Sequence, residues 1–70
     1  MTEVTIYDIN AGRTLEIVYE LRSTLMQGRD FDYSFYQGGY DWEMHEHRSY
    51  KTIFSFTNPQ DATAFSLKYL

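Results

Sequence analysis

Four residues of the types that bind metal ions lie within one short segment of the chain, residues 41–47. They are Asp41, Glu43, His45 and His47. Alternate residues of a β-strand point to the same face, roughly 6.6 Å apart along the strand, so an extended segment would place all four side chains together. A His-x-His pair can hold one metal ion through two imidazoles, with a carboxylate as a further ligand. The segment is therefore a candidate site for a metal ion or a small ligand.

The same four residues also fit an exposed, solvated strand face. A metal site normally draws its ligands from separate elements and needs supporting hydrogen bonds, and the chain has no other histidine. Imidazoles beside carboxylates would equally suit a pH sensor. We favour the solvated face, so that no resident cofactor is expected and the metal site is kept as the alternative.

Catalytic motifs are missing from the sequence. It has no cysteine, no glycine-rich phosphate loop, no Ser-x-x-Lys and no Gly-x-Ser-x-Gly turn. A domain of 70 residues also rarely has the concavity to enclose a substrate. We therefore expect a protein that is not an enzyme.

Most of the aromatic residues lie between positions 31 and 56. Tyr33 and Tyr36 have opposite parity in a strand, so one face of a sheet does not accommodate both. Some rings should then be exposed or at an interface, where Tyr, Trp and Arg often supply much of the binding energy. The alternative is that the rings cover the edge of a small core. The candidate partner-binding residues are Tyr33, Tyr36, Tyr40, Trp42, Tyr50 and Arg22.

Composition limits the class of partner. The net charge is −4, and the six cationic residues are spread along the chain, whereas a nucleic-acid-binding surface normally carries clustered Lys and Arg. No apolar run approaches the roughly 20 residues of a membrane span, and no signal-peptide pattern opens the chain. We expect a cytoplasmic protein with a protein partner, and neither nucleic acid nor membrane.

Periodicity and turn residues predict a succession of strands and helices. The expected strands cover 3–9, 30–37, 40–46 and 50–57, and the expected helices cover 13–27 and 58–69. Gly38-Gly39 is expected to reverse the chain between the second and third strands. Residues 40–57 could form two strands or one long strand with a bulge.

Each expected helix has recognisable end signals. Asn10 can cap the first helix and Gly28 can terminate it, while Asn58 followed by Pro59 opens the second. Arg22 falls inside the apolar arc of the first helix, where its stem could lie along the core or its head could bind a partner. The expected core residues are Ile6, Leu15, Val18, Leu21, Leu25, Phe54, Phe56, Ala62 and Phe65.

This order predicts a single α+β domain spanning residues 1–70. The fold is a two-layer sandwich with three or four mostly antiparallel strands and two helices on one face, in the order β-α-β-β-(β)-α. Two half-repeats of the ferredoxin type would need a further strand after the second helix. The side left open is a sheet edge or a helix flank, and dimerisation would cover it.

The expected function is a non-enzymatic protein–protein interaction module. It should be self-associating, a homo-oligomer that uses the aromatic hairpin 31–50 as its contact surface. Small size, acidity and the lack of catalytic motifs resemble many small phage proteins that act by binding a host protein. No residue pattern identifies a family.

Overall fold

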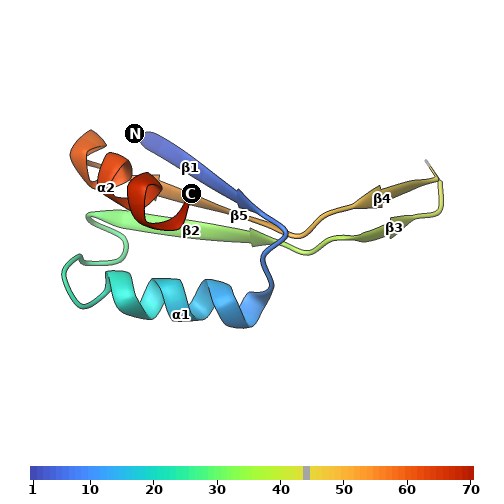
Figure 1. Cartoon of the computed structure of the whole chain (residues 1–70), viewed down its shortest axis with the longest axis horizontal. Helices are drawn as coiled ribbons and strands as arrows, with labels where there is room; N and C mark the ends of the chain where they lie inside the picture. Colours follow the sequence, from blue (N-terminus) through green and yellow to red (C-terminus); the bar gives the residue numbers. More distant parts are fainter. Residues whose placement is uncertain (44) are drawn as a thin grey trace.

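Seven elements follow one another along the chain. The computed structural model describes residues 1–43 and 45–70, with the side chains of residues 40, 41 and 46–48 outside the description. The elements are β1 (Thr2–Tyr7), α1 (Ala11–Leu21), β2 (Phe31–Tyr36), β3 (Gly39–Asp41), β4 (Glu46–Arg48), β5 (Lys51–Phe56) and α2 (Pro59–Tyr69) (Figure 1).

Three strands form the main sheet, in the order β1-β5-β2. Both β1 and β2 pair antiparallel to β5, with Val4 and Tyr33 on either side of Phe54. β1 and β2 are consequently parallel to each other, and α1 connects them across the strand that lies between. This arrangement is a split β-α-β unit.

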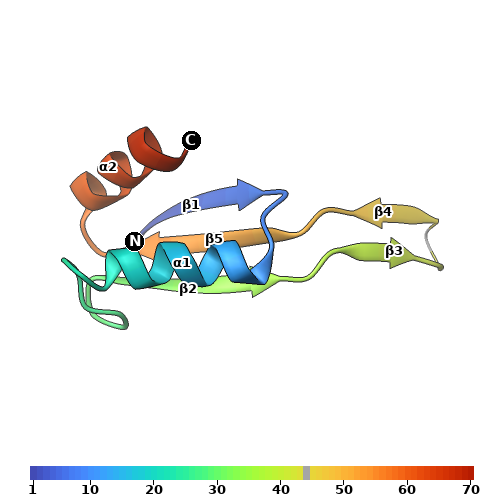
Figure 2. The same ribbon diagram turned by 60° about the horizontal axis from the view of Figure 1, so that its bottom comes forward.

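Both helices cover one face of this sheet. α2 packs on β1 and β5, and α1 packs on β2; the two views place both helices on the same side (Figures 1 and 2). Burial alternates along β5, where Thr52, Phe54 and Phe56 are buried and their neighbours are partly exposed. The predicted two-layer α+β fold is confirmed, with three strands in the sheet.

The core lies between the sheet and the two helices. Its buried apolar residues are Val4, Ile9, Ile17, Val18, Phe31, Phe54, Phe56, Ala62 and Phe65. One polar contact is buried among them: the hydroxyls of Thr14 on α1 and Thr52 on β5 lie 2.7 Å apart. The Thr14 hydroxyl also donates to the carbonyl of Asn10, so both buried hydroxyls have partners.

The first helix is shorter than predicted. It ends at Leu21 with Arg22 as its C-cap, so Gly28, at φ 89°, belongs to the turn before β2. Ser23 donates its hydroxyl to the carbonyl of Glu20, which competes with the backbone bonds that would continue the helix. The Asp30 carboxylate then accepts the backbone N–H of Met26, which closes the turn.

The buried face of α1 also differs from the expected one. Leu15 was expected in the core but is 58% exposed, whereas Ile17 is buried. The predicted arc was wrong because Thr14 lies near the centre of the face that is buried and looks polar in the sequence, although its hydroxyl is satisfied by Thr52 and Asn10. Ile6, Leu21 and Leu25 are partly buried against the core, as a shell around it.

The chain reverses between β3 and β4, and not at Gly38-Gly39. β3 pairs with β4, with Gly39 opposite Arg48 and Asp41 opposite Glu46. The predicted strand 40–46 is therefore replaced by two short strands and a tip. Gly39 has φ 149° and lies where the arm from β2 enters β3. Its freedom to adopt a positive φ is therefore used within an arm of the hairpin and not in a turn.

The second helix begins as predicted. The Asn58 side chain accepts the backbone N–H of Gln60, Pro59 occupies the first turn, and Asp61 lies near the positive end of the helix dipole. The N-cap of the first helix is confirmed as well, since the Asn10 side chain accepts the N–H of Arg13 at 2.7 Å.

Candidate protein-binding surfaces

The β3–β4 hairpin projects from the body. It forms a two-stranded sheet of its own, continuing the arms that leave Tyr36 and enter Lys51, and it points away from both helices (Figures 1 and 2). The molecule is consequently elongated, with extents of 41 × 21 × 21 Å. A lone two-stranded ribbon is marginally stable in water, so this hairpin is an exposed appendage of a compact sheet.

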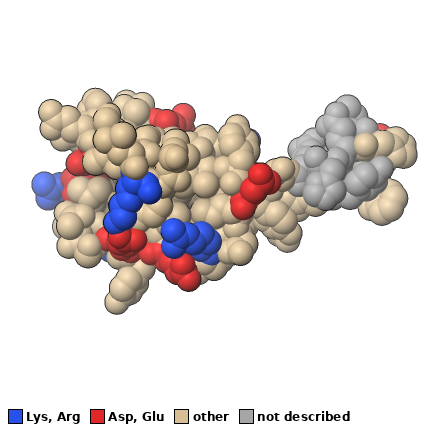
Figure 3. All heavy atoms as spheres, viewed as in Figure 1, with Lys and Arg blue, Asp and Glu red and all other residues tan. Residues whose placement is uncertain are grey.

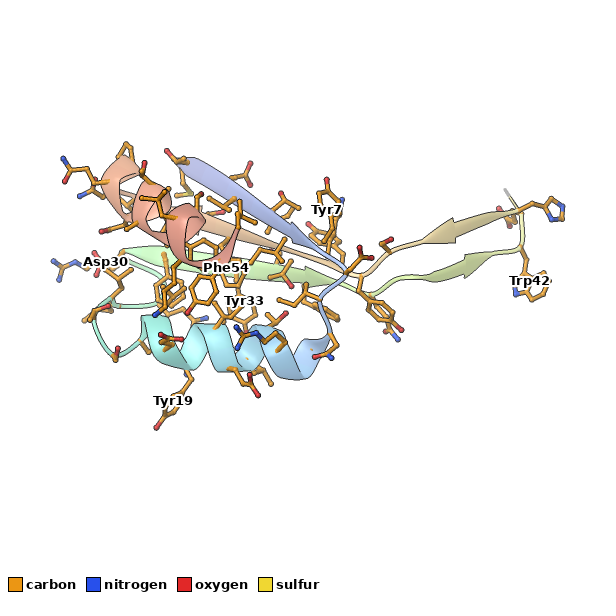
Figure 4. The ribbon with its side chains drawn as sticks, viewed as in Figure 1. Tyr7, Tyr19, Asp30, Tyr33, Trp42 and Phe54 are labelled. Carbon is orange, nitrogen blue, oxygen red and sulfur yellow. The ribbon has the colours of Figure 1, made fainter. Side chains whose placement is uncertain are left out.

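Trp42 lies at the tip of this hairpin and is 78% exposed, as Figure 4 shows. It directly follows the last residue of β3. His45, on the other side of the tip, has a left-handed backbone with φ 54°. The large aromatic side chain is thus presented at the end of the hairpin, far from the core (Figure 4).

A row of three side chains crosses the open face of the sheet where the hairpin begins. Tyr7, Lys51 and Tyr36 are opposite one another in the strand register. The Lys51 ammonium lies 5.3 Å from the centroid of the Tyr36 ring, a cation–π distance. Tyr7 is 64% exposed and Tyr36 49% exposed, and with Gln37 and Ser49 the row lines a hollow.

The other predicted partner-binding residues lie elsewhere. Tyr33 is half-buried on the helix-covered face and stacks on Phe54 (Figure 4). Tyr50 is 40% exposed and stacks on Phe35. Arg22 is exposed at the end of α1, and its guanidinium donates to the side-chain oxygen of Gln27.

Of the predicted contact set, Tyr36, Trp42, Tyr50 and Arg22 are therefore exposed and Tyr33 is partly covered, while the side chain of Tyr40 is outside the described residues. The sequence reasoning missed Tyr7. Its parity, opposite to that of Val4 and Ile6, was the signal that placed it on the open face. Parity alone did not reveal the strand register, which places Tyr7 opposite Lys51.

The candidate metal ligands do not share one strand face. Asp41 ends β3, Glu43 and His45 belong to the tip, and His47 lies in β4. The shared face required one extended strand, so that premise was wrong. The side chains of Asp41 and His47 lie outside the described residues, and among those described no three His, Asp or Glu side chains are grouped to hold a metal ion. The metal site stays a prediction.

A polar contact joins the two helices, on the side of the molecule away from the open face of the sheet. The Glu20 carboxylate on α1 accepts hydrogen bonds from the Lys68 ammonium and, at 2.6 Å, from the Tyr69 hydroxyl. These bonds hold the pKa of Glu20 below its usual value and raise the pKa of Lys68. Burial, and then the bond to Glu20, raise the pKa of Tyr69. Positive and negative side chains lie beside each other over the helices (Figure 3).

Each helix also exposes apolar residues on its outer flank. On α1 these are Leu15 and Tyr19, at 58% and 81% exposure, and on α2 they are Leu67 and Leu70, at 84% and 72%. Tyr19 points away from the body (Figure 4). Both flanks face away from the contact between the two helices.

Comparisons with known proteins add no assignment: we found no match to this chain among protein families, curated proteins or solved structures. Within the described part of the chain, neither helix has the length and apolar character needed to cross a bilayer.

Proposed function

We propose that this protein is a non-enzymatic binding module whose β3–β4 hairpin inserts into a protein partner. The observation that carries the proposal is the position of Trp42, which is 78% exposed at the tip of a ribbon outside the core. A Trp that is mostly exposed buries little of its surface in the free protein, whereas burying it against a partner would supply large apolar contact area.

The base of the hairpin supports the same function. Tyr7 and Tyr36 flank Lys51 where the ribbon meets the sheet, so a partner that receives the tip would also meet two half-exposed phenol rings and one cation. Tyr side chains suit the rim of an interface because each has an apolar ring and a polar tip.

Charge favours a protein partner over a nucleic acid. At the far end of the open face, Glu3 and Asp32 lie on either side of Ser55. Together with the net charge of −4, these carboxylates would repel phosphates.

The test is affinity capture of a partner from an extract of the cells that make the protein, followed by binding measurements with the purified partner. Trp42→Ala should weaken binding by about 2 kcal/mol, the lower bound for a hot-spot residue. Replacing residues 38–49 with Asn-Gly, which leaves a four-residue loop between Tyr36 and Lys51, should abolish binding while the body stays folded.

Tyr19→Ala is the matched control. Tyr19 is as exposed as Trp42, at 81% against 78%, but it lies on α1 of the body. Its substitution should leave the affinity unchanged. If the variant without the hairpin binds the partner as tightly as the wild type, the hairpin is not the contact surface.

A further inference from the structure

The outer edge of β1 is an unpaired strand edge. In the antiparallel ladder the Asp8 N–H donates to the Tyr50 carbonyl at 2.7 Å. Because the direction of the backbone groups alternates along a strand, residues 2, 4, 6 and 8 bond to β5. Glu3, Thr5 and Tyr7 then direct their N–H and C=O groups away from the sheet, and no described residue accepts or donates there.

The opposite edge of the sheet, along β2, is protected by its own chain. The Gly28 N–H donates to the Phe31 carbonyl at 2.7 Å, and Gln27 forms an isolated bridge with Phe31. The Asp32 carboxylate accepts the Tyr33 N–H at 2.8 Å. Among the described residues the outer edge of β1 has no such hydrogen bond or bridge. The six residues of β1 also contain no Pro or Lys, which natural edge strands often carry to prevent pairing with another chain.

We infer that β1 pairs with β1 of a second copy of this chain, forming a continuous six-stranded sheet across a two-fold axis at Thr5. In this register Glu3 lies opposite Tyr7 of the partner subunit, and Thr5 lies opposite Thr5 of the partner subunit. The outward-directed backbone groups of three residues are then all satisfied by the same three residues of the other copy.

The sequence of β1 favours this register. A shift by one residue would place apolar side chains of one copy on the open face of the other. A shift by four residues, which moves the axis to Glu3, would set Glu3 against Glu3 of the partner subunit, and like charges directly opposite destabilise a strand pair. With Thr5 at the axis, Val4 meets Ile6 of the partner subunit on the helix face, and the central pair is Thr–Thr, a favourable combination.

The outer flank of α2 is placed to complete the interface. Lys68 and Tyr69 contact α1, and at 100° per residue Leu67 and Leu70 lie on the opposite side of α2. Because α1 packs on β2 and α2 on β1 and β5, the side of α2 away from α1 is the side toward the free edge of β1. Leu67 lies in α2 and Leu70 is its C-cap, and they are among the most exposed apolar residues, at 84% and 72%.

The position of α2 along the strand agrees with this placement. α2 sits over β1 and β5 and lies toward the Thr2 end of β1 (Figure 1), so two-fold pairing about Thr5 would place the two copies of α2 over opposite halves of the paired strands, with their C-terminal ends toward the axis. Strand pairing alone buries too little surface for a stable dimer, which needs roughly 1,200–2,000 Å² in total. The leucine flanks supply the apolar part of that area.

The test uses the charge at the axis. Thr5 is partly exposed on the open face, so Thr5→Lys and Thr5→Glu should each fold. Sedimentation equilibrium should show a dimer for the wild type. Each variant alone should dimerise about fivefold or more weakly, because a residue at the axis meets its own copy. An equimolar mixture of the two variants should restore the dimer, since opposite charges then face each other.

Two further variants separate the interfaces. Leu67→Glu should weaken the dimer, while Leu15→Glu, on the flank of α1, should not. The protein with Asn-Gly in place of residues 38–49 should dimerise as the wild type does, so this inference does not depend on the hairpin. A wild type that stays monomeric at high micromolar concentration overturns the inference, and so does a dimer that both Thr5 variants form as tightly as the wild type or that Leu15→Glu alone disrupts.

Discussion

Aromatic rings behave differently in the body and in the hairpin of this molecule. In the body, the Phe65 ring of α2 lies 4.8 Å from Phe54 and 5.1 Å from Phe56 between their centroids, and both β5 rings are fully buried. At the tip of the hairpin, Trp42 is mostly in solvent. Similar apolar side chains therefore stabilise the fold in one region and remain available for binding in the other, according to whether a helix covers them.

The largest effect that would test this contrast is the loss of a buried ring. Phe54→Ala should destabilise the protein by about 3–5 kcal/mol, because it removes a ring that is 0% exposed and packed between β5 and α2. That loss is comparable with the whole stability of many small domains, so the variant should be largely unfolded by circular dichroism at 25 °C.

Trp42→Ala is the counterpart in the hairpin. It should change the free energy of unfolding by less than about 0.5 kcal/mol, as for other exposed positions. Urea denaturation followed by circular dichroism would measure both variants. Equal destabilisation by the two substitutions would mean that the hairpin is part of the folding unit and that the contrast is wrong.

A smaller effect should come from the buried hydroxyl pair of the body. Thr14→Val leaves the Thr52 hydroxyl buried, at 0% exposure, without its partner, and should cost about 1–3 kcal/mol. Thr52→Val should cost less, because Thr14 still donates to the Asn10 carbonyl. A double-mutant cycle by urea denaturation measures the coupling; costs that simply add would show that the two hydroxyls do not interact.

The smallest effect concerns the contact between the helices. Bonds from Lys68 and Tyr69 lower the pKa of Glu20 from 4.5, so near this pH the folded state binds fewer protons than the unfolded state. The contribution of this contact to the free energy of unfolding is complete above about pH 4.5 and is lost as the pH falls through the lowered pKa of Glu20. At high pH it is lost as pH rises through the raised pKa values of Lys68 and Tyr69.

Glu20→Gln removes this titration. The wild type should be slightly more stable than the variant at pH 6–8, and the gap should close as the solution is acidified toward pH 3, as measured by thermal melts across the pH range. The bond is exposed, so the gap should also shrink in high salt. A gap that is independent of pH would assign the effect to packing instead of to the carboxylate.

Local signals in the sequence predicted the elements whose ends are chemically marked. Asn10, Asn58 and Pro59 set the starts of both helices, and the alternation of Thr52, Phe54 and Phe56 set the buried face of β5. These features depend on neighbours within a few residues. The fold class followed from their order.

The parts that failed depend on contacts between distant residues. The Thr14 hydroxyl is buried with its hydrogen bonds satisfied, because it donates to the Asn10 carbonyl and accepts from the Thr52 hydroxyl on the central strand, and no local pattern reveals that pairing. The reversal between β3 and β4 was missed because two glycines resemble a turn, whereas pairing of β3 with β4 places them within an arm. Parity showed that some tyrosines must be exposed. It did not show that Tyr33 would be covered or that Tyr7 would lie beside Lys51, because both depend on contacts between residues distant in the sequence.

The place of β5 in the sheet has a consequence for how the chain acquires its structure. β5 is the middle strand, yet it is synthesised after both of its neighbours. While the chain emerges from a ribosome, β1, α1 and β2 have no strand to join them, and pairing of β1 with β5 must close a long loop, which slows folding. Until residues 51–56 are available, the apolar face of Phe31 and Val4 stays open to other chains. A fragment that stops before Lys51 contains both edge strands of the main sheet, β1 and β2, and lacks its central strand, β5.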